Sequence, residues 1–339
     1  MVAQRGRAHH RPGRRAAECE RVHHGRALRR RTGPDRGAGF IHTDDGAAII
    51  GEPHVAATWF PVNDHPSDKA CYVFRITVPA GLEVVANGVP RGRTTSGGLT
   101  TWTWLAAEPM ASYLATATMG QFQLTDRTAR KAPSPAAGDH RVPVQRVGPY
   151  PFAASGGIVD DTFAFGFALE NQTRPIYARG FSFPDSATSV VAHELAHQWY
   201  GDSVAATPGR TSGSTRAPRP TRSGCEARRA ADRRPIRSSP ASTAAARMIR
   251  SGICGSATPG VTGSSTGRVY DRGAMTLHAL RGEIGDADFF ALLETWAQSR
   301  EDGNGTTPEF VALAEQISGQ QLDGFFDAWL FTGSKPPLA

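Results

Sequence analysis

The sequence has few cysteines and no long apolar run. Only four of its 339 residues are cysteines, and no two of them form a CxxC pair, so neither a zinc ribbon nor a disulfide scaffold is indicated. No apolar run approaches the roughly 18–20 residues that cross a bilayer, which excludes a membrane span. A hydrophobic content of 39% is enough for one or two ordinary cores. The composition therefore predicts a water-soluble globular chain.

Lysine is absent from two arginine-rich stretches that carry the positive charge. Residues 1–37 hold 11 Arg against three acidic residues, and residues 205–267 hold 11 Arg against two. The rest of the chain is acidic, although the net charge of the whole is +7. Neither stretch contains Phe, Trp or Tyr, so neither offers aromatic rings on which bases could stack. We therefore expect no nucleic-acid partner.

Composition divides the chain into zones. Residues 1–38 form an Arg-rich head without the apolar stretch of a signal peptide, and we predict no structure there. Because no signal peptide or membrane segment is evident, the expected location is cytoplasmic by default. A β-rich domain is predicted over 39–126 and a mainly helical domain over 127–336. Within the second, residues 205–267 lack the apolar residues of a core and are expected to be disordered.

The strand signal lies between about Phe40 and Asp126. Residues 72–78 place Tyr, Phe, Ile and Val at alternate positions, and residues 101–104 repeat the alternation as Thr-Trp-Thr-Trp. Turn-forming residues at 79–81, 87–88, 90 and 95–98 divide this stretch at intervals that suit hairpins. The pattern predicts an antiparallel sheet.

The helix signal begins after a Pro/Ala/Gly-rich linker at about 130–150. A helix is predicted near 186–200, with Ser186 or Thr188 as its N-cap and Gly201 at its end. Further helices are predicted over 270–281, 288–300, 307–319 and 322–331. Thr307 is expected to cap the third of these, with Pro308 at its first helical position.

Residues 193–197 read His-Glu-Leu-Ala-His inside the first predicted helix. Residues four apart share one helix face, so the imidazoles of His193 and His197 can reach one zinc ion. Glu194 would lie beside the metal as general base and acid, taking a proton from the attacking water and delivering it to the leaving amine. An exposed helix with two solvated histidines is the alternative, but the cap and the apolar residues 190–192 favour a metal site.

Residues 191–202 resemble the zinc helix of the aminopeptidase N family, the gluzincin aminopeptidases also called membrane alanyl aminopeptidases. Residues 167–171 are similar to the GxMEN signature of that family at Glu170 and Asn171, residues 270–274 to its Tyr-x-Lys/Arg-Gly segment, and residues 51–61 to its first-domain segment. The resemblance implies that Glu170 binds the free α-amine of a peptide, with Asn171 beside it in the substrate site. It also implies that Tyr270 donates to the oxyanion and that Glu52 is a second amine-binding acid.

The resemblance covers about residues 40–204 and 268–336. It implies an α+β fold, in which a truncated β-rich N-terminal domain is followed by a mainly α-helical, thermolysin-like catalytic domain. It further implies a zinc metalloaminopeptidase with one zinc ion, acting on peptides that have a free N-terminus. The oligomeric state stays open.

The pattern departs from the family at the third zinc ligand, a glutamate 19 positions after the second histidine. Arg216 occupies that position, and a guanidinium cannot ligate zinc. Codons that encode residues 210–217 can read Asp-Ile-Trp-Leu-Asp-Glu-Gly in a shifted frame, which resembles the third-ligand segment. We therefore expect residues 205–267 to be translated out of frame; rescue by Glu226 is the less favoured explanation, since no apolar periodicity places it.

Three other interpretations stay open. The chain could be a catalytically inactive relative that binds peptides or is a non-functional fragment, which its zinc content would reveal. It could be a basic nucleic-acid-binding protein, which salt-dependent binding would reveal. It could be an endopeptidase of thermolysin type, which would cleave peptides with a blocked N-terminus.

Overall fold

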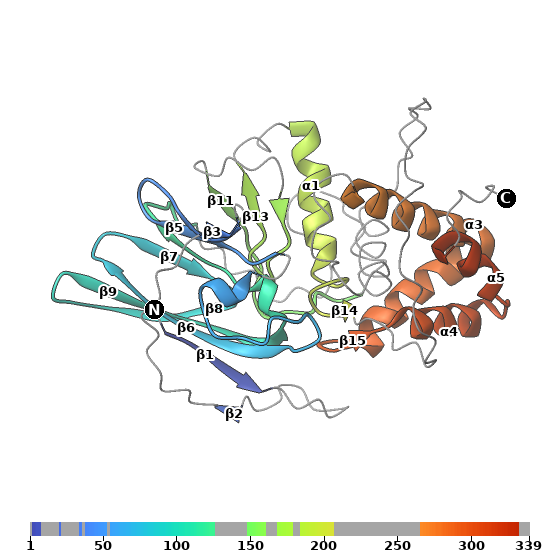
Figure 1. The fold of residues 1–339 in the computed structure, drawn as a ribbon, viewed down its shortest axis with the longest axis horizontal. Coiled ribbons are helices and arrows are strands. Elements are labelled where there is room, and N and C mark those ends of the chain that lie inside the picture. Colours follow the sequence, from blue (N-terminus) through green and yellow to red (C-terminus); the bar gives the residue numbers. More distant parts are fainter. Residues whose placement is uncertain are drawn as a thin grey trace, which may run out of the picture.

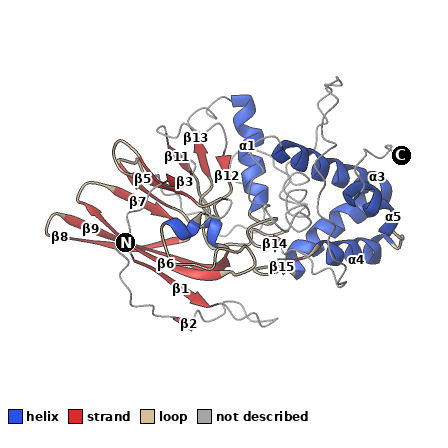
Figure 2. Cartoon of the chain, in the orientation of Figure 1, coloured by secondary structure: helices blue, strands red, loops and turns tan. Residues whose placement is uncertain are grey.

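Two five-stranded antiparallel sheets enclose the core of the N-terminal half in the computed structural model of the chain. Their orders are β2-β1-β6-β9-β8 and β3-β4-β5-β10-β7. Figure 2 shows their strands in red, gathered on one side of the molecule with the long helices on the other. The strands are β1 Val2–Arg7, β2 Glu20–Arg21, β3 Pro34–Asp35, β4 Ala38–His42, β5 Ala47–Ile50, β6 Ala70–Pro79, β7 Glu83–Ala86, β8 Val89–Ser96, β9 Leu99–Met110 and β10 Ala117–Gly120. The structure describes residues 2–7, 20–21, 34–35, 38–52, 55–125, 148–160, 168–178, 184–206 and 265–331.

The predicted period-2 pattern is confirmed in β6. Tyr72, Phe74, Ile76 and Val78 are buried on one face of the strand, and the tryptophans of residues 101–104 are buried on the neighbouring β9. The Gly97–Gly98 turn joins β8 to β9 as a hairpin, with both glycines at positive φ. These apolar faces build the aromatic centre of the core.

The other predicted hairpins are wrong. The segments at 79–81 and 87–88 join strands of different sheets, because β7 belongs to the second sheet while β6 and β8 belong to the first. Gly88 crosses between the sheets at φ 81°, so closely against the Leu105 backbone that a Cβ would collide with it. A turn signal marks where the chain bends, but it does not say which strand the next one joins.

Parts of the Arg-rich head form strands where the sequence predicted none. Backbone groups of β1 pair with one edge of β6, in register Val2 to Arg75, and strand hydrogen bonds depend little on side chains. Cys71 of β6 is disulfide-bonded, although the cysteine spacing indicated no disulfide scaffold. The remaining residues of 1–37 lie outside the described ranges.

A small sheet follows the N-terminal sheets and shares their core. It has the order β11-β13-β12, formed by β11 Ile158–Asp160, β12 Ala168–Leu169 and β13 Ile176–Ala178. Ile158, Leu169 and Ile176 pack into the same hydrophobic cluster as Phe74. The core of the β-rich half therefore extends beyond the domain boundary predicted at 126–127.

The rest of the described chain is mainly helical, with the short strands β14 Ala205–Ala206 and β15 Asn304–Gly305, and α1 lies between the β-rich half and the other helices (Figure 1). The helical elements are α1 Pro184–His197, α3 Ser265–Ser299, α4 Thr307–Ser318, α5 Asp323–Phe326 and the π-helical turn Asp327–Phe331, with short 3-10 turns at Ala56–Thr58 and Ser112–Leu114. None of the described helices combines the length and apolarity that a membrane crossing requires.

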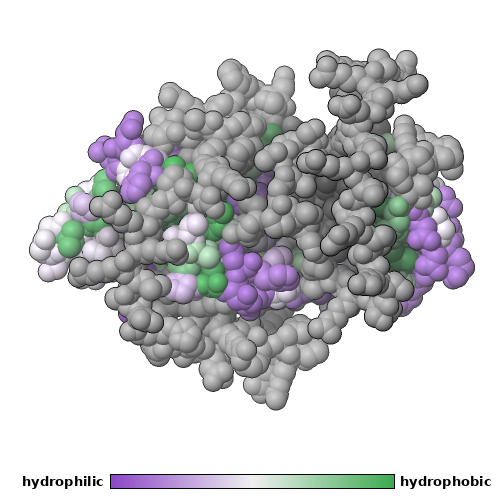
Figure 3. All heavy atoms as spheres, in the orientation of Figure 1, coloured by the Kyte–Doolittle hydropathy of each residue, from purple (hydrophilic) through white to green (hydrophobic). Residues whose placement is uncertain are grey.

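The two helices predicted over 270–281 and 288–300 run together in α3, which is broken by non-helical backbone at Gly285. The apolar sides of α3 and α4 form a second core that includes Leu280, Trp296, Phe310 and Phe326. On the face shown in Figure 3, hydrophilic residues form the outer edge of the helical half and hydrophobic ones lie inward of them. This division is typical of amphipathic helices.

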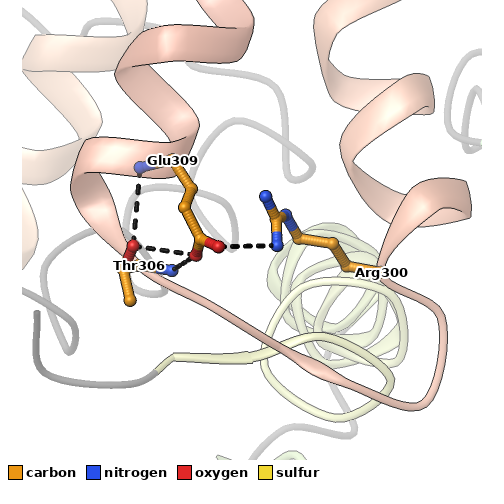
Figure 4. Close-up of polar contacts among 3 residues, drawn as sticks. All are labelled: Arg300, Thr306 and Glu309. Carbon is orange, nitrogen blue, oxygen red and sulfur yellow. Dashed lines mark hydrogen bonds and ion pairs between the residues drawn. The ribbon is translucent and has the colours of Figure 1, made fainter. Parts of the chain in front are cut away.

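A capping box opens α4 one residue earlier than predicted. The N-cap is Thr306 instead of Thr307: its hydroxyl accepts from the backbone N–H of Glu309, whose carboxylate accepts from the backbone N–H of Thr306 at 2.8 Å (Figure 4). Arg300 donates to Glu309 at 3.2 Å and covers the ring of Trp296 at 4.5 Å. The helix ends at Gly319 with φ 68°, as predicted.

We expect the Thr306→Ala variant to lower the free energy of unfolding by about 1 kcal/mol, because the first turn of α4 loses its side-chain acceptor. Urea unfolding followed by circular dichroism measures the change. The Thr306→Ser variant keeps the hydroxyl and should unfold within a few tenths of a kcal/mol of the parent chain. Equal loss in both variants would show that the cap contributes nothing.

A buried lysine joins the β-rich half to the end of α1. The ammonium of Lys69, just before β6, donates to the carbonyl oxygens of Asp202 and Ser203, each at 2.7 Å. Burial lowers the pKa of Lys69 to about 8, against the raising effect of the charges of Asp302 and Asp202. Burial likewise raises the pKa of Asp302 to about 6, partly offset by Lys69.

These shifts predict how stability depends on pH. Because the pKa of Asp302 in the folded chain exceeds its ordinary value of 3.8, the folded state binds the extra proton between about pH 4 and pH 6, and the contribution of this carboxyl to stability falls as the pH rises through that window. Asp302→Asn removes the titration. We expect its free energy of unfolding, relative to the parent chain, to rise between pH 4 and pH 6 by on the order of 1 kcal/mol.

Urea unfolding at intervals of half a pH unit measures this difference. Asp44→Asn, at an exposed turn, is the matched control and should show no such rise. If the difference in the free energy of unfolding between the Asp302→Asn variant and the parent chain did not change with pH, the raised pKa of Asp302 would be contradicted.

Candidate metal centre

Two histidine nitrogens meet on one face of α1. The Nε2 atoms of His193 and His197 are 3.1 Å apart, and the two rings are nearly perpendicular at a centroid distance of 4.6 Å. Two nitrogens bound to one tetrahedral zinc at 2.0–2.1 Å would be about 3.3 Å apart. The predicted helix has therefore brought the two imidazoles to a separation that suits a shared metal ion.

A backbone carbonyl sets the orientation of His197. Its Nδ1 lies 3.1 Å from the carbonyl oxygen of Tyr200, and a carbonyl only accepts, so Nδ1 carries the proton in this contact. The Nε2 atom then presents its lone pair toward His193. A second contact of this kind is what fixes the tautomer of metal-binding histidines.

Carboxylates complete the group. Glu170, Glu194 and His197 each offer a ligand atom within 4.8 Å of the others, and the three side chains are 2%, 5% and 1% exposed. Buried carboxylates beside two imidazoles are a donor set that divalent zinc accepts. The residues present in the described part of the chain therefore fit a metal ion, with Glu170 reaching the site from the end of β12.

Gln198 ties the segment after β12 to α1. Its amide nitrogen donates to the carbonyl of Glu170 at 3.2 Å and to the carboxylate of Asp202 at 2.8 Å. Its amide oxygen accepts from the backbone N–H of Thr173 at 2.8 Å and from the hydroxyl of Tyr150 at 3.3 Å. All four hydrogen-bonding positions of a fully buried amide are therefore used, and the Glu170 backbone is held against the helix that carries the histidines.

The β-rich half holds the other side of the same segment. Asn87 donates to the carbonyls of Leu114 and Gln172, and Gly88 donates to the Thr173 hydroxyl at 2.8 Å. Thr173 is held at φ 65°, a conformation that costs a β-branched residue about 1–3 kcal/mol. The surrounding bonds impose this strained backbone three residues after Glu170.

Asn171 and Gln172 are fully buried beside Glu170. The amide nitrogen of Asn171 donates to the Leu114 carbonyl at 3.0 Å, whereas its oxygen and both polar atoms of the Gln172 side chain have no hydrogen-bond partner among the described residues. Buried polar atoms of this kind are usually satisfied by water or a ligand. Asn171 therefore has an acceptor to offer beside Glu170.

The remaining predicted residues are placed less completely. Glu52 follows β5 and is half-buried, but it is not part of the Glu170–Glu194–His197 group found among the described residues. Tyr270 lies in the first turns of α3, and its side chain is outside the described part. Arg216, Glu226 and almost all of residues 205–267 lie outside the described ranges, so their predicted disorder stays a prediction.

Sequence reasoning missed two residues near the histidines. Tyr177 on β13 is half-buried, and its pKa is raised first by burial and then by the negative charge of Glu194. Gln198 lies within the stretch 191–202 that resembles the zinc helix, but the sequence pattern assigned it no role of its own. Its position directly after the second histidine was the available signal, because a residue at the end of a buried helix face must have its polar groups satisfied.

Comparisons with known proteins show what the chain is similar to. Residues 47–114 match the family described as Peptidase M1 N-terminal domain. The chain is 27% identical over 198 residues to glutamyl aminopeptidase of Rattus norvegicus. The matched stretch covers 48% of this chain and 21% of that protein. It therefore spans about a fifth of the length of this curated relative.

Solved structures share the fold. A mutant of the M1 zinc metallopeptidase from Deinococcus radiodurans matches with a TM-score of 0.62 at 24% identity, covering 89% of this chain and 73% of that one. Aminopeptidase A of Legionella pneumophila, in complex with aspartic acid, matches with a TM-score of 0.60 at 17% identity, covering 86% and 38%. A structure of the Deinococcus protein also holds a Tyr-Ser-Ala substrate.

These likenesses define the class. The β-rich N-terminal half and the partly helical remainder have the arrangement of M1 peptidases. The comparisons therefore support the resemblance to the M1 aminopeptidase family, through the N-terminal domain at residues 47–114 and through the fold.

We expect Gln198→Met to lower the free energy of unfolding by about 2–4 kcal/mol, because the N–H of Thr173 and the carboxylate of Asp202 would lose a buried partner at nearly constant side-chain volume. Urea unfolding measures the loss. Gln298→Met, on the exposed side of α3, is the matched control and should change stability by less than about 0.5 kcal/mol. If the two variants were equally stable, the hydrogen bonds of Gln198 would not stabilise the segment after β12.

Proposed function

We propose that this chain is a zinc-dependent aminopeptidase that hydrolyses the N-terminal residue of peptides in a thermolysin-like catalytic domain. The observation that carries the proposal is the buried group of Glu170, Glu194 and His197, with the half-buried His193 3.1 Å from His197 between their Nε2 atoms. The match to the M1 family supports it.

His193 and His197 would hold one zinc ion through Nε2. When bound, zinc would supply a Lewis acid that makes water acidic near neutral pH. Glu194, buried beside the histidines, would take the proton of the attacking water and return it to the leaving amine. Tyr270 would donate its hydroxyl to the oxyanion.

The amine end of the substrate would meet carboxylates. Glu170 is buried and close to the histidines, so a cationic α-amine would find its countercharge there. Asn171 has a buried oxygen beside it that could accept from the same amine, and Glu52 would be a second acid in the same role. Peptides with a free N-terminus are therefore the proposed substrates. The bound Tyr-Ser-Ala of the Deinococcus protein supports this choice.

A second candidate rests on Arg216. If this residue is real, no glutamate stands at the third-ligand position and the chain would be an impaired or inactive relative that binds peptides. Sequencing the coding DNA across codons 200–270 tests the frame hypothesis directly. Zinc content of the purified chain separates the two candidates.

We expect Glu194→Gln to keep zinc bound and to lower the rate of hydrolysis of aminoacyl-anilides by roughly 10²–10⁴-fold, because the proton acceptor is lost while the histidines remain. His197→Ala should lose zinc and activity together. Zinc by atomic emission and anilide release by absorbance measure both. Glu283→Gln, at an exposed site of α3, is the control.

Anilides with an acetylated N-terminus test the role of the free amine, and we expect them to be hydrolysed much more slowly than the free substrates. Equal hydrolysis of blocked and free substrates would contradict the proposed role of Glu170 and favour an endopeptidase. A chain that binds zinc at no measurable level would contradict the aminopeptidase assignment and favour the inactive relative.

A further inference from the structure

Lys69 buries a positive charge that the proposed reaction does not use. Its side chain is 8% exposed, and taking an ammonium out of water costs several kcal/mol. The residue lies on the β-rich half, before β6, yet its partners are 133 and 134 residues later in the chain. Because burial of the ammonium is so costly, we looked for a segment of the chain that its hydrogen bonds keep in place.

The two carbonyls that Lys69 binds belong to the turn that ends α1. There the backbone N–H groups of Asp202, Ser203 and Val204 donate to the carbonyls of residues 197, 198 and 199, at 3.0, 3.1 and 3.1 Å. These bonds span five residues instead of the four of an α-helix, so the backbone widens after α1. They bond residues 202–204 to residues 197–199 at the end of the helix. A cation at this end also meets the negative end of the helix dipole.

The same turn orients His197. The Tyr200 carbonyl accepts from Nδ1 of His197, and along the chain Tyr200 lies between the end of α1 and the two carbonyls that Lys69 binds. Movement of residues 202–203 would therefore reach the Tyr200 carbonyl along the chain through Gly201, and would reach His197 itself through the bond from the Asp202 N–H to the His197 carbonyl. The Nε2 atom that faces His193 would follow.

Residues 302–305 form a third segment that contacts both the turn after α1 and the chain before β6. β14 Ala205–Ala206 pairs with β15 Asn304–Gly305 beside the lower end of α1 (Figure 1). The backbone N–H of Asp302 donates to the Ser203 hydroxyl at 3.2 Å, and the Asn304 amide donates to the Ser67 carbonyl at 3.2 Å. Asp302 is held at φ 62°. Of the two carboxylates that raise the pKa of Lys69, Asp302 has the larger effect.

We infer that Lys69 is a positioning residue for the histidine pair: by clamping the turn at 202–203 to the β-rich half, its ammonium fixes the Tyr200 carbonyl and thereby the orientation of the His197 imidazole. This inference rests on the proposed function for its relevance to zinc, but the clamp itself is a property of the metal-free chain. It assigns the β-rich half a direct part in shaping the metal centre.

The test compares Lys69→Met with Arg75→Met, which removes an exposed cation from β6, the strand that follows Lys69. In the metal-free full chain, we expect amide hydrogen exchange at residues 202–204 to be about tenfold faster or more in the Lys69→Met variant. The His197 Nδ1–H resonance, visible by NMR in the parent chain, should weaken as the ring loses its fixed tautomer. Zinc affinity should fall by roughly 10–100-fold. The Arg75→Met variant should change none of these.

The outcomes separate the inference from the proposed function. Unchanged exchange at 202–204, or faster exchange with an unchanged His197 resonance, would overturn the positioning role. If the parent chain binds no zinc, the proposed function fails, while exchange and the His197 resonance still decide the inference. Should Lys69→Met not fold, Lys69→Gln keeps an N–H₂ group without the charge, and about a threefold effect on the same readouts is expected.

Discussion

The buried amide of Gln198 is the interaction on which the candidate centre depends. It binds the carbonyl of Glu170 and the N–H of Thr173, which lie in the segment after β12, and the carboxylate of Asp202, which lies in the turn after α1. Because none of these groups can reach water, each needs a partner inside the protein. One side chain thereby fixes the separation between the acid segment and the histidine helix.

The β-rich half contributes to the centre through its backbone. Asn87 and Gly88 lie where the chain crosses from one sheet to the other, and at that crossing they bind the residues that follow Glu170. Lys69, just before β6, binds the turn that follows the histidines. The two ends of the site are therefore held by the same pair of sheets, which explains why the core of this half includes Leu169 and Ile176.

Local signals in the sequence predicted the local structure well. The alternation of β6, the HExxH helix and the Pro308 start of α4 follow from side-chain period and capping, which neighbouring residues determine. The hairpins at 79–81 and 87–88 failed because partner choice between strands depends on the whole core. The clamp at Lys69 was not predicted for the same reason, since a lone lysine in a sequence carries no mark of the carbonyls it will meet.

The spacing of the contacts along the chain has a consequence for the order of folding. The bonds that build the centre join residues 85 positions apart at Asn87, 133 at Lys69 and 237 at Asn304. Closing such long loops loses chain entropy before any contact compensates it, so non-local pairings slow folding. The hairpin of β8 and β9 and the helix α4 can form early from local contacts. The metal centre is then among the last parts of the protein to assemble.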